Sequence, residues 1–304
     1  MAKYVVKRVL LAILTIFIVS AITFFSMYAI PGGPFSSEKA LSPAVMAALE
    51  ARYGLDQPVP VQYVNYMTRL ITQRDFGVSL KTGRDVFETI TTGMKVSAKL
   101  GISAAVVAVF FGLIFGSIAA LNRGKVVDRI IVFITTLATS VPSFVLATLL
   151  LLVFSIQLGL VPAWSANNQS YILPVISLCM YPMAYITRLT KTSMLDALNQ
   201  DYVRTARAKG VATYKVIFKH ALRNALIPVV TYVGPMVAFI ITGSMVVETI
   251  FSTGGLGSYF VTSINTRDYT LIMGVTIFLA ILMVTANLIT DIVYKLVDPR
   301  ITFD

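Results

Sequence analysis

Histidine and cysteine are nearly absent from this sequence of 304 residues, which contains one of each. Because Cys179 and His220 are single copies, the chain cannot form an intramolecular disulfide or a histidine–cysteine metal site. One histidine also excludes a His-Glu-x-x-His motif, and Gly124-Lys125 lacks the earlier glycine of a phosphate-binding loop. We therefore predict no catalytic residue, no metal site and no cofactor in this chain.

Charged residues are also scarce, at 13% of the sequence against 57% hydrophobic residues. Soluble domains average about 25% charged residues, so this composition indicates an integral membrane protein. The formal net charge is nevertheless +11. Since the basic residues lie mostly beside apolar segments, membrane topology accounts for them, and we predict no nucleic-acid partner.

Six apolar segments are long enough, or nearly so, to cross a bilayer, which takes about 20 residues. We therefore expect an all-α, polytopic membrane protein with six transmembrane helices. The first segment is longer than the apolar part of a signal peptide, about 7–15 residues, and is expected to be a retained span. Prolines interrupt the third and fourth segments. The six segments are Val9–Ile30, Val96–Leu121, Ile130–Leu158, Tyr171–Leu189, Leu226–Ile250 and Leu271–Leu296.

Lysine and arginine gather in alternate connections between these segments. They lie in the N-terminal tail, after the second segment, between the fourth and fifth segments, and at the C-terminus. The positive-inside rule places these regions in the cytoplasm, so both termini are predicted to be cytoplasmic. Lys95 and Lys99, beside the start of the second segment, are a counter-signal.

The predicted extracytoplasmic loop, 31–95, is too long for a plain connection. Ser42-Pro43 can begin a helix that ends at Gly54, and apolar residues from Val61 to Leu70 indicate a second helix. These helices either cap the membrane domain or form a docking platform for an external partner. We divide the chain into 1–30 with the first span, the helical loop 31–95, and a core membrane region 96–304 that contains the cytoplasmic loop 199–228.

A basic, amphipathic stretch from Asn199 to Leu222 separates the fourth and fifth segments. Five of its apolar residues fall on one face of a helix: Tyr214, Ile217, Phe218, Ala221 and Leu222. A polar helix between two membrane spans needs a protein partner or a lipid surface on its apolar side. This stretch is therefore the expected place where the chain meets another molecule.

Gly112 and Gly116 form a G-x-x-x-G pattern, which brings membrane helices close together. We interpret it as packing within the chain rather than as a seam between two copies. The glycine-rich segment 254–257 lacks a strand–turn–helix setting and is predicted to be a tight turn.

Carboxylates are rare in the predicted spans. Glu248 and Asp291 lie near span ends and are predicted to contact lipid headgroups or a neighbouring chain, so a proton-coupled carrier is weakly supported. Arg188 and Lys191, at the inner end of the fourth span, are predicted to extend to the membrane interface.

Two sequence pieces, Asp201–Gly210 and His220–Pro228, resemble the cytoplasmic EAA loop in permease subunits of bacterial ATP-binding-cassette importers of the oligopeptide/dipeptide group. Arg204-Thr205-Ala206 stands where Glu-Ala-Ala is usual, and Arg223 where a proline is usual. Both departures are typical of the peptide group. The resemblance covers essentially the whole chain and is greatest to the first permease subunit of an oligopeptide system. Further matching pieces are Ile30–Phe35, Tyr53–Leu55, Val96–Leu100, Ile241–Ile250, Arg267–Tyr269 and Asp298-Pro299.

The resemblance implies an importer of several subunits in the bacterial cytoplasmic membrane. A homologous second permease would share the pathway, two cytoplasmic ATPase subunits would bind ATP and Mg²⁺, and an extracytoplasmic peptide-binding protein would deliver the peptide. The basic stretch would be a coupling helix that inserts its apolar face into a groove on an ATPase subunit. Gly210 would either permit close backbone contact or end one helix before the next begins.

Two sets of residues follow from the resemblance. The coupling residues are Asp201, Tyr202, Arg204, Thr205, Ala206, Arg207, Ala208, Lys209, Gly210 and Tyr214. The peptide path, along spans two to five at the interface with the second permease, has Ser140, Pro142, Tyr181, Tyr185, Tyr232, Thr242 and Ser244 as candidates. Two alternatives stay open, namely a permease of the same family for nickel or another small solute, and a stand-alone channel or secondary carrier.

Overall fold

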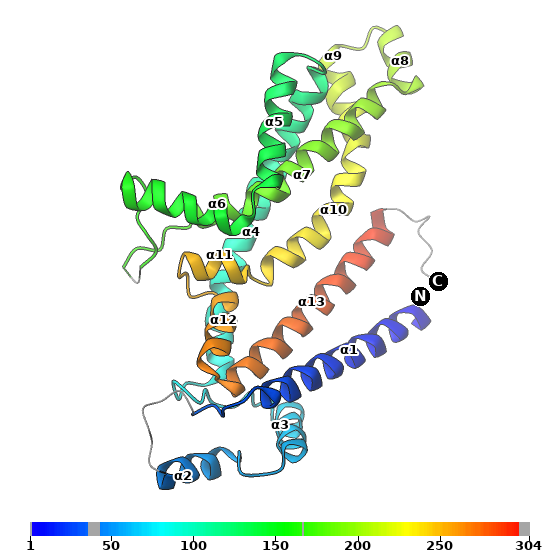
Figure 1. The fold of residues 1–304 in the computed structure, drawn as a ribbon. Coiled ribbons are helices and arrows are strands. Elements are labelled where there is room, and N and C mark those ends of the chain that lie inside the picture. Colours follow the sequence, from blue (N-terminus) through cyan, green and yellow to red (C-terminus); the bar gives the residue numbers. More distant parts are fainter. Residues whose placement is uncertain (1, 36–42, 166, 298–304) are drawn as a thin grey trace. The chain divides into compact units, whose positions relative to one another are not determined.

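The computed structural model describes residues 2–35, 43–165 and 167–297. These residues form helices and two isolated β-bridges, which confirms the all-α prediction. The Ser42 cap and the Asp298-Pro299 match lie outside the described residues, as does the Asp291 side chain. The elements are α1 Ala2–Ala29, α2 Pro43–Tyr53, α3 Val59–Gln73, α4 Val86–Leu121, α5 Val126–Ser140, α6 Ser143–Leu150, the π-helix η1 Leu151–Gln157, α7 Ile172–Leu198, α8 Asp201–Ala208, α9 Thr213–Lys215, the π-helix η2 Val216–Leu222, α10 Arg223–Ile241, α11 Met245–Ile250, α12 Leu256–Thr266 and α13 Tyr269–Val297 (Figure 1).

Five helical segments of the described chain are long and apolar enough to cross a membrane, and a bent pair of helices raises the number to six if the pair is one span. The multi-span prediction is therefore confirmed, and the fourth predicted span is a continuous helix despite Pro182 inside it. The second differs at its start, because α4 begins at Val86 instead of Val96. Glu88 and Lys95 lower the hydropathy of that first part, so the apolar run in the sequence begins only at Val96.

The third predicted span is not one straight helix. Its two halves, Val126–Ser140 and Ser143–Gln157, are bent by 102°. Val141 has φ −84° and ψ 123°, an extended conformation, because the ring of Pro142 disfavours the helical region for the residue before it. Pro142 then starts the next helix, where its missing N–H costs nothing.

The chain packs as two compact units. Among the described residues, the first contains 2–35, 43–96 and 254–285, and the second contains 97–165, 167–253 and 286–297. In the first unit, α3 packs against α1, and the start of α13 completes an aromatic core around Phe24, Tyr63 and Tyr269. The buried Ser20 hydroxyl lies 2.9 Å from the Tyr63 hydroxyl and ties α1 to α3.

The segment Arg267–Tyr269 joins distant parts of the first unit. Arg267, with φ 57°, ends α12, and its Nη1 donates to the carbonyls of Pro31 at 3.0 Å and Gly32 at 2.9 Å. The Tyr269 hydroxyl donates to the carbonyl of Met27 at 3.3 Å. Helix α12 itself was missed by the sequence analysis, which predicted only a turn at 254–257. Gly254 does form a turn, with φ +66°, but the helix begins two residues later.

Asp268 is the buried centre of this segment, with 1% of its surface exposed. Its Oδ2 accepts a hydrogen bond from Ser79 Oγ at 2.5 Å, and its Oδ1 accepts from the backbone N–H groups of Leu80 at 3.1 Å and Leu271 at 3.2 Å. One carboxylate therefore caps the start of α13 and holds the turn that precedes α4.

In the second unit, α7 packs against α5, α6 and α10. Gly112 and Gly116 of α4 lie against α7, because a Cβ added at Gly112 would lie 2.7 Å from Ile186 Cγ2 and one at Gly116 would lie 2.5 Å from Thr190 Cβ. The interpretation of the G-x-x-x-G pattern as packing within the chain is confirmed. Figure 1 shows α8 and α9 at one end of this unit and α6 and α11 at the other.

Replacing Gly116 by valine should destabilise the full chain by about 1–3 kcal/mol, the usual cost of an overpacked core. The added side chain would also meet the Thr187 carbonyl oxygen, 2.6 Å from the new Cβ. Gly33→Val adds the same atoms where nothing lies within 4 Å and serves as the control. Thermal melting of both variants in detergent measures the difference, and equal midpoints would contradict the close packing of α4 on α7.

Glu248 and Lys191, both in the second unit, have different surroundings from those expected. Glu248 is 0% exposed and accepts a hydrogen bond from Ser97 Oγ at 2.7 Å, so its predicted contact with headgroups or a neighbouring chain is wrong. Lys191 forms an ion pair with the buried Asp128 of α5, Nζ to Oδ1 at 2.5 Å, instead of extending freely to the interface. A buried carboxylate requires such a partner, and each pair ties two helices together.

Candidate functional site

The basic stretch between α7 and α10 folds as two helices joined by a turn. Helix α8 begins at Asp201 and ends at Ala208, and α9 begins at Thr213. Gly210 has φ +73° and follows the end of α8, so the second of its two predicted roles is the one observed within the chain. From Thr213, helical residues run without a break to Ile241 through η2 and α10.

The apolar side of α8 is already covered by its own chain. Val203 is 0% exposed and Ala206 is 7% exposed, and both pack with Val216 of η2 and with Val211 of the turn. Val203 and Ala206 are therefore used within the chain, and the docking of the basic stretch on an ATPase subunit stays a prediction. The predicted apolar face lay on residues 214–222, and the sequence did not show that the turn folds α8 back onto η2.

The remaining predicted coupling residues are exposed. Asp201, Tyr202, Arg204, Thr205, Arg207, Ala208, Lys209, Gly210 and Tyr214 lie on the surface of the turn and its helices, and only Ala206 is buried. Asp201 and Arg204 lie 3.6 Å apart, but both are so exposed that the pair adds little stability. This surface offers polar and charged groups, with the rings of Tyr202, Tyr214 and Phe218 as its large apolar parts.

A positively charged hollow opens beside Gly210. Its volume is about 530 Å³, and its charged lining comes from Lys209, Lys215 and Lys219, with His220 alongside. Cationic groups around one hollow attract acidic side chains of a protein or anionic headgroups of a lipid. The turn can therefore receive negative charge on one side while α8 presents Arg204 and Arg207 on its surface.

Three of the predicted path residues lie together. Tyr181 and Tyr185 are one turn apart on α7 and are 55% and 40% exposed, and the ring of Tyr185 lies 4.3 Å from that of Tyr232 on α10. They form a tyrosine face, which we define as Tyr181, Tyr185 and Tyr232. Polar side chains within a membrane span rarely face lipid. The exposed phenol groups on these two helices therefore indicate a face that contacts a polar molecule or another protein chain.

The other path candidates lie at helix breaks. Ser140 ends α5 and Pro142 follows at the bend, where Ser140 Oγ donates to the Thr136 carbonyl at 2.8 Å. Thr242 Oγ1 donates to the Phe239 carbonyl at 2.7 Å. Ser244 caps α11, accepting from Val247 N–H at 3.3 Å. The hydroxyl groups of Ser140, Thr242 and Ser244 are thus used within the chain.

Comparison with known proteins places these features in a family. Residues 112–303 match the family described as binding-protein-dependent transport system inner membrane component, and residues 1–101 match its N-terminal family. The chain belongs to this family. It is 46% identical to the dipeptide transport system permease protein DppB of Bacillus subtilis, over 99% of this chain and 98% of the relative. It is 43% identical to the oligopeptide transport system permease protein OppB of Haemophilus influenzae, over the full length of both.

Solved structures agree with the fold of this inner-membrane component. The crystal structure of an amino acid ABC transporter with histidines matches with a TM-score of 0.56 and 15% identity, covering 69% of this chain and 94% of that chain. The inward-facing MetNI methionine ABC transporter matches with a TM-score of 0.55 and 16% identity, covering 69% of this chain and 97% of that chain. The chain is a multi-pass inner-membrane component of a binding-protein-dependent transport system.

Proposed function

We propose that this family member is one of two permease subunits of an ATP-driven importer that moves oligopeptides or dipeptides across the bacterial cytoplasmic membrane. The observation that carries the proposal is the turn at Gly210. It is a surface of exposed cations and aromatic rings on a membrane subunit, at full-length similarity to dipeptide and oligopeptide permeases. Its partners would be a homologous permease, two ATPase subunits that bind ATP and Mg²⁺, and an extracytoplasmic peptide-binding protein.

The turn would lie in the cytoplasm, together with both termini, as the distribution of basic residues predicts. An ATPase subunit would then contact the exposed side of α8 rather than its apolar side. Arg204, Arg207 and Lys209 would pair with acidic groups of that subunit and fix its register. Charge complementarity of this kind predicts that docking weakens as salt concentration rises.

Movement would pass from α8 to the membrane through packing inside this chain. Val203 and Ala206 of α8 contact Val216, and helical residues continue from there to Ile241. A displacement of α8 by ATPase closure would therefore displace η2 and α10. The tyrosine face at Tyr185 and Tyr232 would move with α10 relative to α7, so the pathway would switch between two arrangements.

The proposal is tested by reconstitution of the complete transporter in proteoliposomes. Uptake of labelled trialanine should require ATP and should fall to background when either the second permease or the ATPase subunits are omitted. Nickel ions are the competing cargo in the same assay. Uptake of nickel but not of trialanine, or uptake by this chain alone under an ion gradient, would overturn the proposed function.

A further inference from the structure

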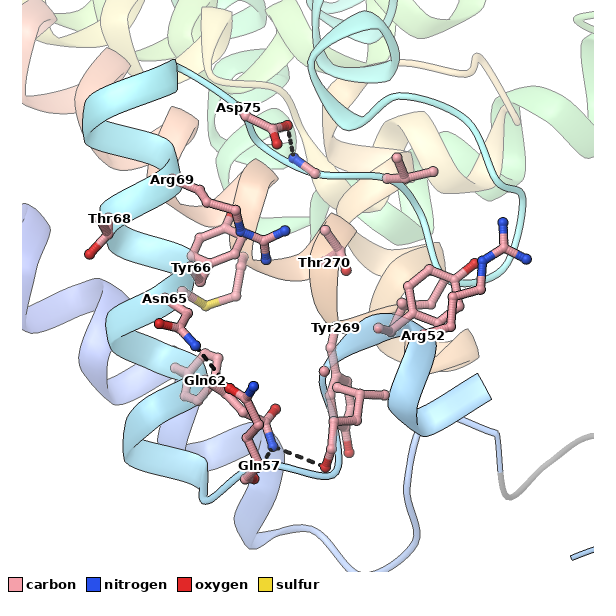
Figure 2. A pocket seen from close by; sticks show the side chains of 18 of the residues that line it. Arg52, Gln57, Gln62, Asn65, Tyr66, Thr68, Arg69, Asp75, Tyr269 and Thr270 are labelled. Atoms are coloured by element: carbon pink, nitrogen blue, oxygen red, sulfur yellow. Dashed lines mark hydrogen bonds between the residues drawn. The ribbon is translucent and has the colours of Figure 1, made fainter. Parts of the chain in front are cut away.

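The first unit contains a hollow of about 620 Å³ that is separate from the turn at Gly210 and from the tyrosine face. It lies between α2 and α3, and the end of α1 and the start of α13 line it as well. Figure 2 shows Tyr66 and Arg69 coming from α3, Arg52 from α2, and Thr270 from α13. Ligand pockets commonly have volumes of about 300–1,000 Å³, so a short peptide fits in size.

Tyr66 is an unused hydrogen-bond donor in the lining of this hollow. It is 7% exposed, and its hydroxyl has no hydrogen-bond partner in the described part of the chain. The buried amide of its neighbour Gln62 is satisfied, since its Nε2 donates to the carbonyls of Leu55 at 3.1 Å and Gln57 at 2.7 Å. Buried hydroxyls are nearly always paired, so the Tyr66 hydroxyl calls for an acceptor from outside the chain.

Burial raises the pKa of the Tyr66 hydroxyl above its ordinary value, while Arg69 lowers it and Asp75 raises it by smaller amounts. The hydroxyl therefore keeps its proton at neutral pH and acts as a donor.

The charges around the hollow favour a ligand with a carboxylate. Arg69 follows Tyr66 by one turn on α3, and Arg52 lines the hollow from α2. A guanidinium group matches the two oxygens of a carboxylate. Asp75 lies just beyond the end of α3 and also lines the hollow, and its Oδ1 accepts from Gly77 N–H at 2.7 Å.

We propose that this hollow binds a short peptide by its terminal carboxylate, with Tyr66 donating to it and Arg69 pairing with it. Asp75 faces the peptide ammonium group, and the rings of Phe24, Tyr28 and Tyr269 supply an apolar wall. The proposal rests on the proposed function, because it takes the transported peptide as the ligand. It adds a peptide site on the membrane subunit itself, in the part of the chain predicted to be extracytoplasmic.

The test measures binding of labelled trialanine to the purified full chain in nanodiscs of neutral lipid, by equilibrium dialysis. Saturable binding is expected, and it should weaken at least tenfold for the C-terminal amide of the same peptide. Arg69→Gln and Tyr66→Phe should each weaken binding at least tenfold, because a hydrogen bond to a charged group contributes about 1.5–3 kcal/mol. Arg84→Gln, an exposed arginine outside the hollow, is the matched control and should bind as the unmodified chain does.

Three results of the dialysis experiment overturn the proposal. They are absence of saturable binding, equal binding of acid and amide peptides, and wild-type affinity in both pocket variants. Competition by phosphatidylglycerol nanodiscs that removes trialanine binding would also overturn it, assigning the hollow to a lipid headgroup. Trialanine uptake by the complete transporter is measured in parallel. If the unmodified transporter takes up trialanine but this chain does not bind it, the peptide site alone is refuted. If the unmodified transporter takes up no trialanine, the proposed function is refuted.

Discussion

Gly210→Val is expected to reduce ATP-driven peptide uptake at least tenfold while the chain still inserts and assembles at normal levels. Gly210 has φ +73°, a conformation that costs an L-residue about 1–2 kcal/mol and a β-branched residue more. A factor of ten corresponds to about 1.4 kcal/mol, so strain at this one residue is large enough to disturb the turn. Uptake per assembled transporter in proteoliposomes measures the effect.

A series at this position separates backbone strain from contact with a partner. A Cβ at Gly210 meets nothing within 4 Å in this chain, and asparagine tolerates positive φ, so Gly210→Asn should keep most of the uptake if strain is the cause. Equal loss in both variants would instead indicate that a partner's backbone lies against Gly210. Gly124→Val is the control, since Gly124 has φ +78° and equally open surroundings in a different turn. Normal uptake by Gly210→Val would refute the coupling role.

Asp268→Ala is expected to lower the free energy of unfolding by about 4 kcal/mol. The variant loses three hydrogen bonds to a buried carboxylate, one of which caps α13, and each is worth about 1.5–3 kcal/mol when the partner is charged. Some of this cost is recovered if water enters the space. Thermal melting of the full chain measures the loss of stability, and hydrogen exchange across residues 77–85 shows whether the turn before α4 opens.

Two comparison variants test whether the loss of stability comes from the buried hydrogen bonds of Asp268. Asp268→Asn keeps one amide oxygen for the N–H groups of Leu80 and Leu271 and should lose roughly half as much stability. Asp85→Ala removes an exposed carboxylate that accepts from Glu88 N–H at 2.8 Å at the start of α4, so it should cost about 1 kcal/mol. Equal melting of the Asp268→Ala and Asp85→Ala variants would mean that the buried contacts do not hold the turn.

Local sequence signals predicted the elements that depend on neighbouring residues. Hydrophobic length identified the spans, Gly54 marked the end of α2 with φ +68°, and the spacing of Gly112 and Gly116 indicated close helix packing within the chain. Each of these signals acts through geometry within a few residues of the chain. Such geometry is encoded directly by residue type.

The features that sequence reasoning missed depend on contacts between distant residues. Asp128 meets Lys191 and Ser97 meets Glu248 across different helices, and neither pair has a spacing that a single sequence reveals. The folding of α8 onto Val216 depends likewise on the direction of the turn at Gly210. In the candidate site, residue types predicted the exposed cations correctly, whereas the buried side of α8 required the three-dimensional structure.

The π-helix η2 gives the connection between the turn and α10 an adjustable register. A π-helical turn holds one residue more than an α-helical turn, and such segments commonly occur at functional sites. Conversion of 216–222 to α-helix would rotate the following helix by about 100° and shift it by about 1.5 Å along its axis, without breaking the chain of helical residues. A small displacement of α8 would thus rotate α10 about its axis instead of only translating it. Hydrogen exchange at residues 216–222 with and without ATP would distinguish rotation from translation.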